Sequence, residues 1–197
     1  MQKIIIICGG IHSMEITKKF VNLIKTQLGN NLLENYIILP LNQRPPYDAK
    51  NLFDNLIENN ILPQTKALTI IAFSAGVVGC LAMARKWQRE GGIINCFIAF
   101  DGWGVPLIGD FPIHCFSHDL FTHLTTSFWV KGNEHFYAQP AVSHLEMWTA
   151  PLTVSGYHGE KRINLTESLN LLLTKYHGTI TTNFNDNYPP SARRNSN

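Results

Sequence analysis

The chain alternates between short runs of apolar residues and longer segments in which apolar residues recur every three or four positions. The runs predict buried strands, because a strand covered on both of its faces carries apolar side chains at successive positions. They fall at residues 3–8, 35–41, 67–73, 94–100 and 112–117, the last of them short. Five strands of a mostly parallel sheet are therefore expected.

The segments with helical spacing lie between these runs. They fall at residues 13–28, 48–59, 75–89 and 165–176. Ser13 and Asn164 stand at the positions of N-caps for the first and the last of them. Strands that alternate with helices predict an α/β fold, a three-layer sandwich with helices on both faces of the sheet. Residues 118–160 show no clean period and receive no assignment.

The composition fits one folded unit followed by a tail. The chain has 197 residues, of which 45% are hydrophobic and 15% are charged. This length and apolar content predict a single domain over residues 1–178. Residues 179–197 are rich in Asn, Thr, Pro and Arg and predict a flexible polar tail.

The net charge and the cysteines indicate which partners and which cellular compartment to expect. The formal net charge of +2 gives no argument for a nucleic-acid partner. No apolar stretch approaches the length of a membrane span. The four cysteines are Cys8, Cys80, Cys96 and Cys115, which lie in or beside apolar runs and form no CxxC pair. Reduced, buried thiols and a cytoplasmic location are therefore expected.

The carboxyl ends of the predicted strands carry the candidate chemistry. Ligands of parallel α/β sheets bind at this edge. Residues 9–13, Ser74, Asp101 and the pair His118-Asp119 each follow a predicted strand. We expect them to lie along one edge and to form a site.

Ser74 stands between a strand and a helix in the sequence Ala72-Phe73-Ser74-Ala75-Gly76. This pattern matches the nucleophile elbow Gly-x-Ser-x-Gly, with alanine in place of the first glycine. Small residues are needed two positions before and after the serine, because larger ones clash across the strained turn. We therefore predict that Ser74 is a nucleophile. The alternative is a small polar N-cap at an ordinary turn.

Backbone N–H groups near Ser74 predict an oxyanion hole. The N–H of Ala75 would lie at a helix N-terminus, which favours a developing negative charge. The second donor would be the N–H of Ile11 or His12, in the Gly-Gly turn after the first strand. That turn matches neither a dinucleotide fingerprint nor a phosphate-binding P-loop, so no nucleotide cofactor is expected. The alternative is again a plain tight turn.

Histidine and acidic residues crowd one segment without the spacing of a metal site. The group comprises His114, Cys115, His118, Asp119 and His123. It matches neither HExxH nor a paired Cys/His finger. We therefore expect neither a metal nor another cofactor.

Five stretches together resemble the α/β-hydrolase superfamily, and more narrowly a group of short cyanobacterial-type proteins with that fold and no assigned activity. They are Gly10-Ile11-His12-Ser13, residues 73–79 (Phe-Ser-Ala-Gly-Val-Val-Gly), residues 101–106 (Asp-Gly-Trp-Gly-Val-Pro), Ser117-His118-Asp119 and residues 144–148 (His-Leu-Glu-Met-Trp). The resemblance implies serine-hydrolase chemistry on a small ester or thioester substrate. The same fold also hosts members without catalysis, so a binding or interaction protein is the alternative.

The resemblance also implies the order along the chain in which the acid and the base follow Ser74. In that superfamily the acid follows the serine and the histidine comes last. The acid usually follows the second strand after the nucleophile, which favours Asp119. Asp101 is the alternative acid, and Asp119 has a second interpretation as the N-cap of a helix over residues 120–128.

His144 is the preferred base. The apolar side chains of Leu145, Met147 and Trp148 would anchor its loop on the core, and a base needs a fixed position. His158, in a later loop before the last helix, is the alternative. The predicted triad is thus Ser74, His144 and Asp119.

Overall fold

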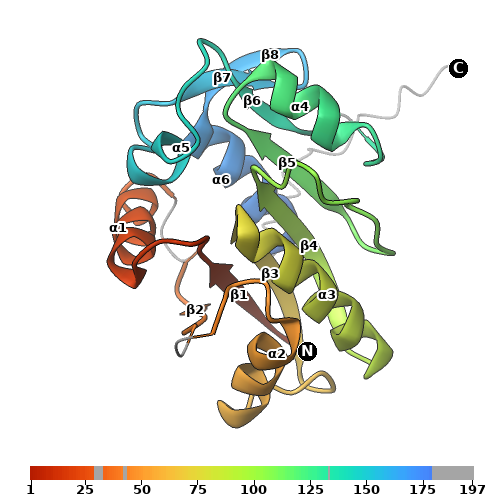
Figure 1. Cartoon of the computed structure of the whole chain (residues 1–197). Coiled ribbons are helices and arrows are strands. Elements are labelled where there is room, and N and C mark those ends of the chain that lie inside the picture. Colours follow the sequence, from red (N-terminus) through yellow and green to blue (C-terminus); the bar gives the residue numbers. More distant parts are fainter. Residues whose placement is uncertain (29–32, 42–43, 133, 179–197) are drawn as a thin grey trace, which may run out of the picture.

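The computed structural model describes residues 1–28, 33–41, 44–132 and 134–178, which form a single eight-stranded sheet flanked by helices (Figure 1). The strands are β1 (Gln2–Cys8), β2 (Tyr36–Ile38), β3 (Lys66–Phe73), β4 (Ile93–Phe100), β5 (Ile113–Ser117), β6 (Phe136–Ala138), β7 (Ser155–His158) and β8 (Lys161–Asn164). The helices are α1 (Met14–Lys25), α2 (Ala49–Glu58), α3 (Ala75–Arg89), α4 (Leu120–Ser127), α5 (Glu146–Thr149) and α6 (Leu165–Tyr176).

The sheet is mostly parallel. Its strand order is β2-β1-β3-β4-β5-β6-β7-β8, and the pairings from β2 through β6 are parallel. The pairings of β7 with β6 and with β8 are antiparallel, so the sheet is mixed at one end. The predicted α/β class with a mostly parallel sheet is therefore confirmed, with an antiparallel hairpin added to it.

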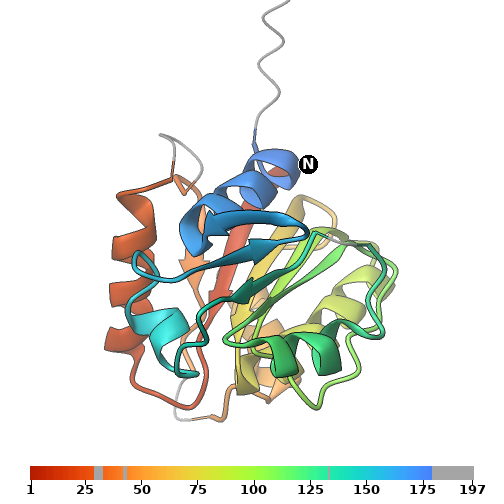
Figure 2. The same ribbon diagram turned by 90° about the horizontal axis from the view of Figure 1, so that it is seen from above.

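Helices cover both faces of the sheet (Figure 2). Alternate side chains of the central strands enter two separate cores: Ile6 and Ile70 pack under α2 and α3, and Ile5 and Ile71 pack under α1, α5 and α6. Because both faces are covered, successive positions of a central strand are apolar. This is why the inner strands read as continuous apolar runs in the sequence.

The ends of the elements follow local side-chain chemistry. Asn164 caps α6 in a capping box, in which its side chain accepts the N–H of Glu167 and the Glu167 carboxylate accepts the N–H of Asn164. Ser13 precedes α1 as expected, but its side chain makes no capping hydrogen bond. The strand expected at residues 35–41 is shorter and spans only Tyr36–Ile38.

The unassigned residues 118–160 contain α4, β6, α5 and β7. Three of these elements, β6, α5 and β7, have only three or four residues, too few to establish a hydrophobic period. The four cysteines are buried free thiols. No helix in the described ranges is both long enough and apolar enough to cross a membrane. The predicted tail at 179–197 lies outside the described residues.

Candidate active site

Ser74 occupies the sharp turn between β3 and α3. Its backbone has φ 55° and ψ −125°, a conformation that side-chain-bearing residues rarely adopt. Its N–H donates to the carbonyl of Phe100 at 2.8 Å, which ties the turn to the neighbouring strand β4. A strained, held backbone at a single serine is the geometry of a nucleophile elbow.

Small residues around Ser74 make this turn possible. A β-carbon on Gly76 would lie 2.3 Å from the carbonyl oxygen of Gly9, so any side chain there would collide with the end of β1. A β-carbon on Gly10 would lie 3.0 Å from the Ser74 β-carbon. Ala72, at the first position of the motif, is fully buried in the core beneath α2 and α3. The fold thus accepts a methyl group where the elbow pattern has glycine.

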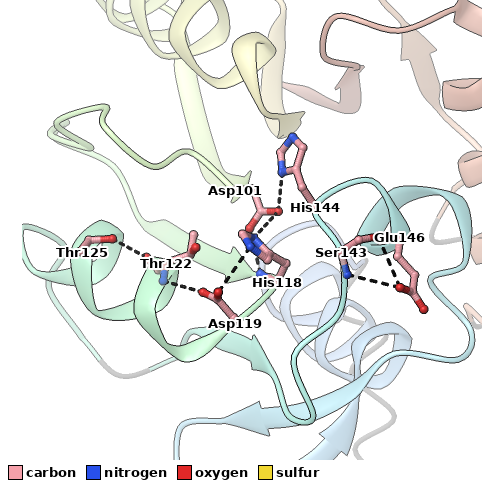
Figure 3. A network of polar contacts seen from close by, with 8 residues as sticks. All are labelled: Asp101, His118, Asp119, Thr122, Thr125, Ser143, His144 and Glu146. Atoms are coloured by element: carbon pink, nitrogen blue, oxygen red, sulfur yellow. Dashed lines mark hydrogen bonds and ion pairs between the residues drawn. The ribbon is translucent and has the colours of Figure 1, made fainter.

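Asp101 directly follows β4, and its carboxylate lies between the side chains of His144 and His118 (Figure 3). Its φ is also positive, at 50°, and its side chain is fully buried. Carboxylate Oδ1 accepts the backbone N–H of His118 at 2.9 Å. Oδ2 lies 2.8 Å from Nδ1 of His144, within hydrogen-bonding distance. A buried carboxylate that contacts an imidazole in this way holds the ring in one orientation.

Aromatic stacking holds His144 in place. Its ring stacks on Phe73, the residue before the serine, with ring centroids 4.6 Å apart. Trp148 also stacks on Phe73, at 4.9 Å, and on Phe20 of α1, at 3.6 Å. Met147 and Trp148 are buried as predicted, whereas the prediction for Leu145 is wrong because this side chain is 41% exposed. The His144 loop is therefore anchored through α5 and the Phe73 ring.

Asp119 serves as the N-cap of α4. Its carboxylate accepts the N–H of Thr122 at 2.7 Å. Partial burial opposes ionisation, but the hydrogen bonds from Thr122 and the proximity of His118 hold the pKa of Asp119 below its ordinary value. Its Oδ2 lies 3.5 Å from Nε2 of His118. Asp119 thus faces His118, and the carboxylate that contacts His144 belongs to Asp101, the alternative acid.

His158, the alternative base, lies elsewhere in the fold. It is the last residue of β7 and is not in a loop, and its Nδ1 lies 2.8 Å from the hydroxyl of Ser168 on α6. Burial lowers the pKa of its imidazole. His158 does not line the pocket that contains Ser74, whereas His144 does.

The predicted oxyanion donors differ in whether their N–H groups already have hydrogen-bond partners. Ala75 begins α3 and lines the pocket, and first-turn N–H groups lack partners within their own helix. The N–H of His12 donates to the carbonyl of Gly10 at 2.9 Å. Within the described ranges the Ile11 N–H makes no such backbone bond, so of the two candidates it is Ile11 whose N–H is available to a ligand.

The pocket above Ser74 has a volume of about 740 Å³. Its floor carries Ser74, Asp101 and His144, while Val78, Trp103, Val105 and Phe121 contribute apolar walls. Trp103 and Phe121 are both largely exposed at this pocket. The volume lies within the range of sites for small organic ligands.

The hydroxyl of Ser74 makes no hydrogen bond to any side chain in the part of the chain that the structure describes. His144 and Ser74 share the pocket without such a bond between them. Catalytic hydrogen bonds are often long in unliganded enzymes and shorten when substrate binds.

The sequence placed His118 at this edge of the sheet but did not include it in the predicted triad. Its backbone N–H binds Oδ1 of Asp101, and its ring Nδ1 lies 3.1 Å from Oδ2. The available signal was its place directly after β5, beside Asp119.

No protein-family model matches the chain, and no curated protein matches it. The function is therefore inferred from the geometry of the site.

Proposed function

We propose that this chain is a serine hydrolase of the α/β-hydrolase type that cleaves a small ester or thioester. The observation that carries the proposal is the contact between Asp101 and Nδ1 of His144 in the pocket that also contains Ser74. The parallel strand order and the positive φ of Ser74 support it. In this proposal Asp101 takes the role that the sequence favoured for Asp119.

The reaction would begin with attack of Ser74 Oγ on the acyl carbon. Nε2 of His144 accepts the hydroxyl proton while Asp101 holds the Nδ1–H and stabilises the imidazolium. The N–H groups of Ala75 and Ile11 bind the oxyanion. His144 then gives its proton to the leaving alcohol or thiol. A water molecule hydrolyses the acyl-enzyme by the same steps, and no cofactor is required.

The pocket walls indicate the substrate class. Apolar side chains dominate the lining beside Ser74, and no Lys or Arg of the described ranges belongs to it. A substrate with an apolar acyl or aromatic part would therefore be favoured over an anionic one. The sequence likewise predicted an acyl substrate.

A second candidate is a binding protein that retains the fold without catalysis. The specific observation in its favour is the missing hydrogen bond from the Ser74 hydroxyl. A serine that no base can reach would keep the strained turn but would not be activated. The two candidates differ in the reactivity of one oxygen atom.

Covalent labelling by a fluorophosphonate tests the proposal, because only an activated serine reacts rapidly. Intact-mass spectrometry of the wild type should show one adduct, and Ser74→Ala should show none. Ser13→Ala is the matched control, since Ser13 is exposed and makes no capping hydrogen bond. This control should label like the wild type.

A folded wild-type protein that stays unlabelled would overturn the hydrolase proposal and favour the binding protein. An adduct that persists in Ser74→Ala would place the reactive serine elsewhere and would overturn it equally.

A further inference from the structure

The carboxylate of Asp101 meets two imidazoles at a single oxygen. Oδ2 lies 2.8 Å from Nδ1 of His144 and 3.1 Å from Nδ1 of His118 (Figure 3). The carboxylate is fully buried, and among the residues that the structure describes no Lys or Arg lines the pocket around it. A buried negative charge without a cation nearby carries a large desolvation cost. A triad needs only one histidine at this carboxylate, so the second one calls for an explanation.

We propose that Asp101, His118 and His144 form a binding site for a divalent transition-metal ion of the Zn²⁺ type, and that the bound ion switches off Ser74. The second part rests on the hydrolase proposed above, whereas the first part stands on the cluster alone.

The distances suit such an ion. One ligand atom from each of the three residues can be chosen so that all lie within 4.8 Å of one another. Ligand atoms about 2.1 Å from a tetrahedral Zn²⁺ lie about 3.4 Å apart. Nδ1 of His144 and Nδ1 of His118, now 2.8 Å and 3.1 Å from Oδ2 of Asp101, would move out by about 0.6 Å and about 0.3 Å to reach that spacing. A water molecule or substrate oxygen would supply the fourth ligand.

The hydrogen-bonding state of His118 supports the same site. Its Nδ1 is buried and has no hydrogen bond of acceptable geometry, although it lies close to Oδ2 of Asp101. A ring nitrogen that points at a carboxylate without forming a proper hydrogen bond is free to donate a lone pair instead. Two imidazole nitrogens and one carboxylate oxygen favour Zn²⁺ and related ions over Mg²⁺ or Ca²⁺, which prefer oxygen ligands.

Metal binding and serine activation exclude each other because they use the same ring. A neutral imidazole carries one proton. If Nδ1 of His144 binds the ion, that proton resides on Nε2, which then cannot accept the proton of Ser74. The ion also takes the Asp101 oxygen that would stabilise the imidazolium.

Zinc binding to the metal-free full-length chain can be measured by isothermal titration calorimetry. The wild type and Ser74→Ala should bind one Zn²⁺ with the same affinity, because Ser74 is not a ligand. His118→Asn and His144→Asn should each weaken binding by at least the roughly 10–100-fold known for loss of a supporting residue at zinc sites. His123→Gln, on α4 outside the cluster, is the matched control and should bind like the wild type. Circular dichroism confirms that each variant is folded.

The same titration followed by fluorophosphonate labelling tests the switch. Stoichiometric Zn²⁺ should suppress labelling of the wild type, and a chelator should restore it. In His118→Asn, suppression should require a Zn²⁺ concentration at least tenfold higher.

Absence of Zn²⁺ binding in a wild type that labels would overturn this inference and leave the hydrolase standing. Zn²⁺ binding in a wild type that never labels would support the metal site and overturn the hydrolase. Zn²⁺ binding that leaves labelling unchanged would overturn the proposed switch. Zn²⁺ binding that persists in both His118→Asn and His144→Asn would overturn the proposed ligands.

Discussion

At the scale of single residues, two aspartates that look alike in the sequence have different environments. Asp101 directly follows β4, and Asp119 follows β5 after one intervening residue, His118. Asp101 adopts a positive φ and turns its carboxylate beneath the sheet edge toward His144, whereas Asp119 adopts extended backbone and caps a helix. The backbone conformation thus separates an acid beside the candidate base from a structural N-cap.

Substitution of each aspartate by asparagine should separate these environments. Asp101→Asn removes the charge that stabilises the His144 imidazolium, and we expect the rate of fluorophosphonate labelling to fall by about 10²-fold or more. Asparagine caps helices as well as aspartate does, so Asp119→Asn should change labelling and stability far less. Labelling rates and thermal melts of both variants check this. An equal or larger loss of labelling in Asp119→Asn would assign the acid to Asp119.

At the scale of elements, the β3-turn-α3 unit depends on the absence of one side chain. Glycine-to-alanine exchange inside a helix ordinarily stabilises a protein. Gly76 is different, because its β-carbon would lie 2.3 Å from the backbone oxygen of Gly9 at the end of β1. The carbonyl group of Gly9 cannot move aside as a flexible side chain would. An added β-carbon at Gly76 would therefore displace the helix itself.

Gly76→Ala should therefore destabilise the protein by about 1–3 kcal/mol, the usual cost of overpacking, and should slow labelling of Ser74. Chemical denaturation measures the first effect and intact mass the second. Ala82→Gly, at an exposed position of the same helix, is the control. It should lower the free energy of unfolding by about 1 kcal/mol through helix propensity alone and leave labelling unchanged. A Gly76→Ala variant as stable as the wild type would refute the close packing of α3 against β1.

At the scale of the whole molecule, several histidines are kept neutral by burial. Desolvation lowers the pKa of His135 to about 4 and also lowers the pKa values of His114, His123 and His158. These four side chains lie on β5, α4 and β7 and beside β6. The half of the sheet that carries the antiparallel hairpin is therefore sensitive to acid.

Stability should fall as the pH is lowered from about 6.5 toward 4. In this window His135 binds a proton in the unfolded chain and not in the folded protein, so this residue contributes a loss of up to about 1.4 kcal/mol per pH unit. The lowered pKa values of His114, His123 and His158 add to the loss in the same direction. Above pH 6.5 the contribution is fully present. Denaturation curves at pH 7.5, 5.5 and 4.5 would measure the slope, which should be shallower in His135→Gln. A stability independent of pH across this range would contradict the burial of neutral imidazoles.

The sequence predicted the parts of the fold that have long periodic patterns. The prediction of α3 at residues 75–89 is confirmed, because an apolar strand, a serine between small residues and a basic last turn all mark its limits. The later strands were missed because β6 and β7 contain three and four residues. The sequence favoured Asp119 as the acid, whereas the carboxylate beside His144 belongs to Asp101. The pattern could not indicate this contact, because it depends on the φ of Asp101 and on the path of a loop 43 residues later in the chain.

The 43 residues that separate Asp101 from His144 have a consequence during synthesis on the ribosome. Ribosomal synthesis delivers residues from the N-terminus, and long-range contacts form late in folding. Ser74 and Asp101 emerge first, with the first four strands, and the histidine proposed as the base follows only after β6. A growing chain therefore exposes its serine before any partner can activate it. The chemistry proposed for this site would be withheld from the nascent protein until the sheet is nearly complete.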